Sequence, residues 1–236
     1  MTHHFGVLIP STNTTVEIEY SRLLPPSLQA HVGRLLTSGT GPFAPGKDED
    51  VDYQARLLGT ARVEVISLAQ TSASLFADDY DEVTVKRMTE ASGVPSLTSA
   101  QAIGRALRAL GTPRIAFATP YSQDTIARAR RYYETKYAIA VAASESLGAS
   151  DSYAIGKMDA GIAQAAFRRI DRADIDALVV PGGNFPTMKW IAAWEQEFGK
   201  PVVTTNQAAL WAILKAMRIN TPLPGKGQLL ERMPEG

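Results

Sequence analysis

The stretch FGVLIPSTNTTVEI, residues 5–18, decides the fold, because its pattern returns later in the chain as RIAFATPYSQDTIA, residues 114–127. Aligning Pro10 with Pro120 places the two copies 110 residues apart. Each copy has an apolar run, a polar turn and then helical spacing, which predicts a buried strand followed by a helix. In the first copy Thr14 and Glu17 have the spacing of a capping box, so we expect them to begin that helix.

Two further pairs of segments match in the same order along the chain. The pairs are VEVISLAQTSAS with IDALVVPGGNFPT (63–74 and 175–187) and PSLTSAQAIGRALRAL with PVVTTNQAALWAILKAM (95–110 and 201–217). Aligning Gln70 with Gly182 gives a spacing of 112 residues, and the third pair gives 106 residues. Three matches at nearly constant spacing predict a chain built from two similar halves.

The apolar runs are continuous rather than alternating, which is typical of parallel strands covered on both faces. Helical stretches alternate with these runs at residues 50–61, 101–110, 122–133, 160–170 and 207–217. The pattern predicts an α/β fold of two pseudo-symmetric, doubly wound parallel-sheet domains of flavodoxin-like type, with the site between them. We expect residues 1–97 plus 207–236 to form the first domain and residues 98–206 the second.

The composition excludes several functional classes. Lys plus Arg and Asp plus Glu both total 24, and a chain with zero net charge lacks the basic surface typical of nucleic-acid binding. No apolar run approaches the roughly 20 residues of a membrane span, and the N-terminus does not resemble a signal peptide, so we expect a cytoplasmic protein. The chain contains no cysteine, which excludes disulfides and thiol chemistry. Neither GxGxxG after the first strand nor GxxxxGK[ST] occurs, which argues against nucleotide binding.

Ligands of open α/β sheets bind beyond the carboxyl ends of the strands, where the repeated turns lie. These turns are rich in hydroxyl and amide side chains, which together with free helix N–H groups could hold an anion; alternatively they only cap helices. Among these side chains Tyr121 is the best-placed proton carrier. The Gly- and Pro-rich stretch 37–46 is either a lid or an ordinary loop. His3, His4 and His31 lie at the opposite end of the strands, and no metal-ligand cluster is evident.

The motifs PSTNTTVE, QTSAS, ATPYS, PGGNFPT and PVVTTNQAALWAIL together resemble the aspartate/glutamate racemase superfamily, in its branch of maleate cis-trans isomerases and arylmalonate decarboxylases. The resemblance covers most of the chain and implies two pseudo-symmetric domains with the active site between them. It also implies catalysis without a metal or an organic cofactor. Typical members place a cysteine in each half, and the corresponding positions here are Gln70 and Gly182, so this chain lacks both family cysteines. We expect Gly182 to leave room where a thiol would sit.

The resemblance also implies a cradle for a substrate carboxylate. The residues it assigns to substrate binding are Asn13, Thr71, Ser72, Gly182, Gly183 and Asn184. It leaves Tyr121 and Gln70 as the candidate catalytic residues, Tyr121 to deliver a proton and Gln70 to orient substrate or water. Ser152 stands where the family has a further asparagine.

The resulting expectation is an enzyme that decarboxylates a small mono- or dicarboxylate through an enolate-like intermediate. One alternative is a hydrolase or lyase in which Gln70 positions water, and another is a carboxylate-binding protein without turnover. The expected partner is a small carboxylate rather than a nucleic acid or a membrane, and the resemblance makes a homo-oligomer plausible.

Overall fold

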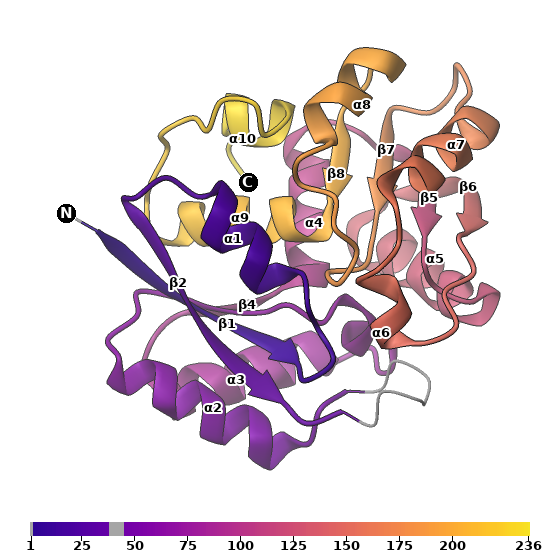
Figure 1. Ribbon diagram of the computed structural model, residues 1–236. Coiled ribbons are helices and arrows are strands. Elements are labelled where there is room, and N and C mark those ends of the chain that lie inside the picture. Colours follow the sequence, from indigo (N-terminus) through magenta and orange to yellow (C-terminus); the bar gives the residue numbers. More distant parts are fainter. Residues whose placement is uncertain (1, 38–44) are drawn as a thin grey trace.

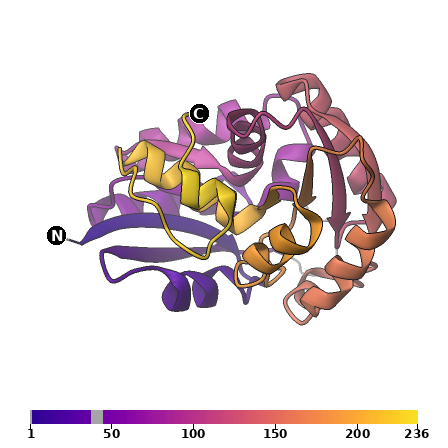
Figure 2. The ribbon, with the colours of Figure 1, turned by 90° about the horizontal axis from the view of Figure 1, so that it is seen from above.

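The computed structural model describes residues 2–37 and 45–236. It contains two four-stranded sheets whose strand orders are the same, β2-β1-β3-β4 in the first half and β6-β5-β7-β8 in the second. All strand pairs are parallel. The predicted fold of two similar doubly wound α/β halves is therefore confirmed, and Figures 1 and 2 show the halves side by side.

The elements follow the predicted strand–helix alternation. The first half contains β1 (His3–Pro10), α1 (Val16–Leu23), β2 (Leu28–Leu35), α2 (Asp48–Thr60), β3 (Ile66–Leu68), the 3₁₀ helix η1 (Thr71–Leu75), α3 (Tyr80–Ser92), β4 (Ser96–Thr98) and α4 (Ser99–Ala109). The second contains β5 (Arg114–Thr119), α5 (Gln123–Tyr137), β6 (Ala140–Ser146), α6 (Ser152–Ile155), α7 (Ala160–Ile170), β7 (Ala177–Val180), α8 (Ile191–Phe198), β8 (Val202–Thr204) and α9 (Thr205–Ala216). The short helix α10 (Gln228–Arg232) follows.

The central strands are apolar because helices cover both of their faces. Every residue of β7 is buried, and so are the residues of β1 from Phe5 to Ile9. In the register Leu8 of β1 lies opposite Gly33 of β2 and Leu68 of β3. The parallel strands β1 and β3 therefore end at the same edge of the sheet, which brings the turns that follow them together.

The third repeat forms the seam between the halves. Each of α4 and α9 begins directly after an edge strand, and the two helices pack against each other between the sheets (Figure 1). Residues 205–214 of α9 are all buried, as expected for a helix surrounded by protein. Because α9 contacts strands of both sheets, the assignment of residues 207–236 to the first domain stays a prediction.

One hydrophobic core runs through both halves, and it includes Phe5 of β1 as well as Phe117 of β5.

The lid interpretation concerns residues 37–46, of which 38–44 lie outside the described residues. Within the part of the chain that the structure describes, no helix is long and apolar enough to cross a membrane.

Candidate active site

The turns that follow β3 and β7 belong to different halves, and they meet at one buried threonine. Thr205, the first residue of α9, has its hydroxyl 3.2 Å from the Thr71 hydroxyl of the first half. The same Thr205 oxygen accepts the backbone N–H of Gly182, at the end of the second sheet, at 2.8 Å. The predicted convergence of the two sets of turns is thus present in the structure.

Thr71 lies at the centre of a group of buried hydroxyls. Its Oγ1 is 2.9 Å from Ser99 Oγ as well as 3.2 Å from Thr205 Oγ1, and it forms a hydrogen bond with Tyr121. Ser99 begins α4 just as Thr205 begins α9, so the repeat places one hydroxyl on each side of Thr71. All four side chains are at most 3% exposed. A dry cluster of this kind can hold its donors in fixed directions.

Tyr121 is held firmly in this cluster. Ser146 donates a hydrogen bond to its backbone oxygen at 2.6 Å. Burial raises the pKa of its phenol, and the hydrogen bond with Thr71 acts in the opposite direction. The phenol therefore stays protonated at neutral pH, and Tyr121 suits a hydrogen-bond donor to a developing oxyanion.

Gly182 does not leave the space that the sequence suggested. Its φ of +135° is a conformation that side chains rarely adopt, and an added Cβ would lie 3.0 Å from Cγ of Pro120. The expectation that Gly182 leaves room for a larger side chain is therefore wrong, because the ring of Pro120, in the turn after β5 of the same half, crowds the position of a Cβ. The Gly182 N–H is already bonded to Thr205, so this amide is engaged inside the protein.

Gly183 brings the two halves into close contact. A Cβ at this position would lie 3.4 Å from the backbone oxygen of Ala69 at the end of the first sheet, and 3.2 Å from Asn206 Oδ1. Gln70 and Ser72, which flank Thr71, are 7% and 4% exposed. These residues thus lie close to the seam, while their contacts with a substrate stay a prediction.

Asn13 caps the first helix. Its Oδ1 accepts the backbone N–H groups of Thr15 and Val16, both at 3.0 Å. The predicted capping box of Thr14 and Glu17 is therefore wrong, and Glu17 instead forms an exposed ion pair with Arg34 at 2.7 Å. Because its oxygen is occupied, the amide nitrogen of Asn13 is the group through which it would bind a carboxylate.

Asn184 links the two halves through its side chain. Its Oδ1 accepts the Thr14 N–H at 2.8 Å, and its Nδ2 donates to the Ser152 carbonyl at 2.7 Å. Its own carbonyl accepts the Thr15 hydroxyl at 2.6 Å. The side-chain oxygen and one of the two amide N–H groups are engaged in these bonds, which favours the backbone N–H of Asn184 as a donor to a carboxylate.

Sequence reasoning missed Ser99 and Thr205, although the aligned pairs TS (98–99) and TT (204–205) in the third repeat carried the signal. It also missed two buried carboxylates, Glu19 and Asp81. Asp81, which is 1% exposed, accepts hydrogen bonds from Ser74, Thr98 and Tyr132. These donors come from η1, from the N-cap of α4 and from α5, so Asp81 joins the site turn of the first half to the second half.

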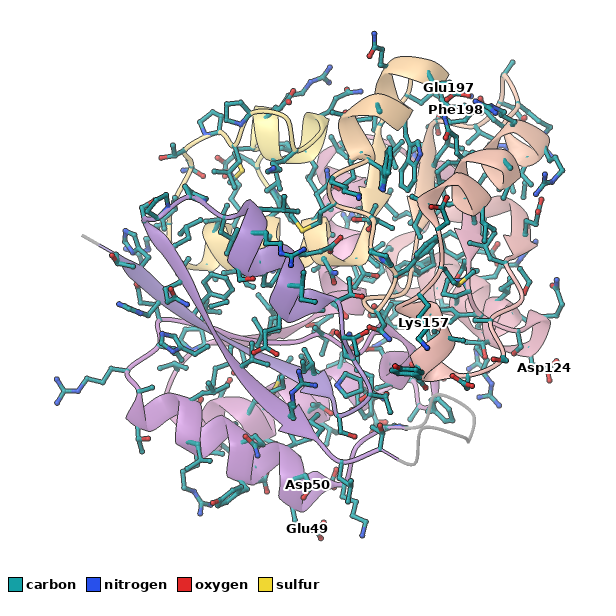
Figure 3. The ribbon with its side chains drawn as sticks, viewed as in Figure 1. Glu49, Asp50, Asp124, Lys157, Glu197 and Phe198 are labelled. Atoms are coloured by element: carbon teal, nitrogen blue, oxygen red, sulfur yellow. The ribbon has the colours of Figure 1, made fainter. Side chains whose placement is uncertain are left out.

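Asp78 and Asp124, two acids that follow the site turns, are exposed. Asp78 forms an exposed ion pair with Arg131, and Asp124 is exposed at the edge of the second half (Figure 3). His4 Nδ1 lies 2.9 Å from His31 Nε2, near the start of the first sheet. Among the described residues, no group of three or more His, Asp or Glu side chains could hold a metal ion.

The chain is similar to characterised proteins over almost its whole length. A family model for arylmalonate decarboxylase matches residues 6–230. An arylmalonate decarboxylase of Bordetella bronchiseptica is 29% identical over 232 residues, which cover 96% of this chain and 95% of that protein. A maleate isomerase of Geobacillus stearothermophilus is 27% identical over 248 residues, 98% of each chain.

Solved structures agree with these similarities. The crystal structure of a maleate isomerase variant from Pseudomonas putida S16 with maleate has a TM-score of 0.88 to this chain, at 26% identity and 98% coverage of both. A structure of unliganded arylmalonate decarboxylase has a TM-score of 0.81 at 26% identity, covering 97% of this chain and 99% of that one.

Proposed function

The chain belongs to the arylmalonate decarboxylase family, a family of enzymes, and on that premise we propose that it decarboxylates a small malonate-type acid without a cofactor. One observation carries the proposal. Thr71 of the first half and Gly182 of the second are joined through the Thr205 hydroxyl, which supports a single carboxylate-sized site at the seam.

The chemistry begins with cleavage of a carbon–carbon bond. One carboxylate leaves as carbon dioxide, and the electron pair of the broken bond is delocalised into the remaining carboxylate as an enediolate. Hydroxyls of Thr71, Ser72 and Tyr121 and backbone N–H groups of Gly183 and Asn184 would stabilise this charge. Donors fixed in a dry site can contribute several kcal/mol to such a transition state.

The final step returns a proton to the α-carbon. With no cysteine in the sequence, the proton comes from Tyr121 or from a water molecule that Gln70 orients. Decarboxylation is favoured over racemisation or isomerisation because it needs neither a pair of thiols nor a thiol adduct.

The test is release of carbon dioxide from malonate and phenylmalonate, followed by NMR of the product in deuterium oxide. We expect one deuterium at the α-carbon, and Tyr121→Phe should lose turnover while it keeps ligand binding. Saturable binding without turnover would instead indicate a carboxylate-binding protein. Hydrolysis of an amide or lactone substrate, with incorporation of water oxygen, would indicate the hydrolase.

A further inference from the structure

We propose that Glu19 is a positioning residue of this site, which acts from α1 of the first half on the turn 182–188 of the second half. The inference rests on the proposed function, because the turn supplies the backbone N–H groups of the carboxylate cradle. Glu19 lies outside the motif pieces that predicted the substrate-binding residues, and the reaction above does not use it.

Within the described residues, the hydrogen bonds that the Glu19 carboxylate accepts all cross the seam. Its Oε1 accepts the backbone N–H groups of Thr187 at 2.7 Å and Met188 at 2.8 Å. Its Oε2 accepts Nδ2 of Asn206 at 2.7 Å. The residue is 7% exposed, so these bonds form away from water, where charge-assisted bonds are strong.

Asn206 connects Glu19 to the turn that supplies the carboxylate cradle. Its Nδ2 also donates to the backbone carbonyl of Gly183 at 3.0 Å, so two acceptors fix the orientation of the amide. Its own carbonyl accepts the hydroxyl of Tyr20, the neighbour of Glu19 on α1, at 2.9 Å. Helix α1 therefore holds Asn206 at two points.

The planar peptide carries the effect to the ligand side. In a trans peptide the C=O and N–H groups point in opposite directions. Fixing the Gly183 carbonyl toward Asn206 therefore fixes the direction of the Asn184 N–H, one of the donors we assign to the carboxylate. Thr205 holds the turn at Gly182 and Glu19 holds it at Thr187 and Met188, so both ends are anchored.

Glutamine has the shape of Glu19 but cannot reproduce this pattern. In Glu19→Gln the amide oxygen can still accept the two backbone N–H groups, while the new NH₂ group faces Nδ2 of Asn206. Two donors then oppose each other, and Asn206 must turn its oxygen toward position 19. The Gly183 carbonyl then loses its donor, and the cradle loses its fixed geometry.

Glu195→Gln is a matched control. Glu195 of α8 is partly buried and likewise accepts two backbone N–H groups, from Val202 at 3.0 Å and Gln228 at 2.8 Å, and both donors lie outside the turn 182–188. Both variants are compared with the unaltered full-length chain by ¹H–¹⁵N NMR, by amide hydrogen exchange and by malonate titration calorimetry.

We expect Glu19→Gln to shift the amide resonances of Asn184, Thr187 and Met188, and to speed exchange at Thr187 and Met188 about tenfold, as loss of charge from a buried acceptor implies. Malonate affinity should fall about fivefold to tenfold, the effect of about one hydrogen bond. Glu195→Gln should leave these resonances in place and change the affinity less than twofold, within ordinary surface effects.

Unchanged resonances at Asn184, Thr187 and Met188 in Glu19→Gln would overturn the positioning role, as would wild-type malonate affinity in that variant. If the unaltered chain fails to bind malonate, the proposed function fails. In that case the resonances and exchange rates still decide whether Glu19 holds the turn.

Discussion

Replacing Gly182 by alanine tests the geometry on which the site depends. Gly182 has a φ of +135°, and its N–H donates to Thr205 at 2.8 Å, so the backbone cannot relax without loss of that bond. An alanine Cβ would lie 3.0 Å from Cγ and 3.2 Å from Cδ of Pro120. Both atoms belong to a rigid ring that cannot rotate away.

The expected loss of stability has two parts. A non-glycine residue in this backbone region costs about 1–3 kcal/mol. Forcing a methyl group against a packed ring costs about 1–3 kcal/mol more, part of which relaxes, so we expect a total of about 2–4 kcal/mol. Gly93, at the C-cap of α3, has a φ of +76° with nothing within 4 Å of an added Cβ. Gly93→Ala therefore introduces a left-handed backbone cost of about 1–2 kcal/mol without a side-chain contact.

Urea unfolding followed by circular dichroism gives both values. Gly182→Ala should be the more destabilised by at least about 1 kcal/mol, because the contact with Pro120 adds to the backbone cost. Gly182→Cys should show the same penalty, so a thiol cannot be restored at this position by one substitution. Equal losses of stability in Gly182→Ala and Gly93→Ala would refute the claim that Pro120, in the turn after β5, packs tightly against Gly182, in the turn after β7.

Three further predictions follow from the same contacts. Thr71→Val removes the hydroxyl that contacts Ser99, Thr205 and Tyr121. Turnover of phenylmalonate should fall about 100-fold, as for loss of one oxyanion donor. Turnover at the wild-type rate would show that Thr71 is not part of the carboxylate cradle. Asp81→Asn leaves Ser74, Thr98 and Tyr132 with one acceptor oxygen fewer. The free energy of unfolding measured in urea should fall by about 2–3 kcal/mol, whereas the same substitution at an exposed carboxylate should not lower it in this way. Burial raises the pKa of Glu19 above 4.5 against the effect of its three N–H donors and of Lys189, while the neighbouring Tyr20 stays neutral because its own pKa is raised. The native state therefore binds the Glu19 carboxyl proton more tightly than the unfolded state does. The stability that protonated Glu19 contributes is present below pH 4.5 and is lost as pH rises through the native pKa of Glu19. The free energy of unfolding of the wild type, relative to that of Glu19→Gln, should therefore decrease as pH rises from 4.5 through the native pKa of Glu19. A difference that stays flat or increases with pH would contradict the burial argument.

Much of the fold could be predicted because its signals are local. The run IAFA in β5 and the run ALVV in β7 are apolar at every position, which is typical of strands covered on both faces. The repeated Thr-x-x-Gln pattern marks the starts of α4 and α9, where the N–H of Thr98 contacts Gln101 at 3.3 Å and that of Thr204 contacts Gln207 at 3.4 Å. The same reasoning failed for Thr14 and Glu17, because Asn13 supplied the cap and Arg34 paired with Glu17.

The candidate site was predictable only in part. Thr71 and Tyr121 were identified from turns beside predicted strands, whereas Glu19 gave no signal because an acid in the first turn of an amphipathic helix is ordinary. Its three partners come from residues 187, 188 and 206, far along the chain. Gly182 was predicted to be roomy, since a glycine in a sequence does not reveal which ring packs against it.

The sequence by itself determined two similar α/β halves, the edges at which their turns lie, and the exclusion of thiol chemistry. These follow from periodicity and composition, which act over neighbouring residues. Only the tertiary structure decided that Thr205 joins the halves, that Pro120 fills the space at Gly182 and that Glu19 reaches across the seam. Such contacts depend on how two packed bodies are placed to within fractions of an ångström, and close packing sets that placement through the whole core at once.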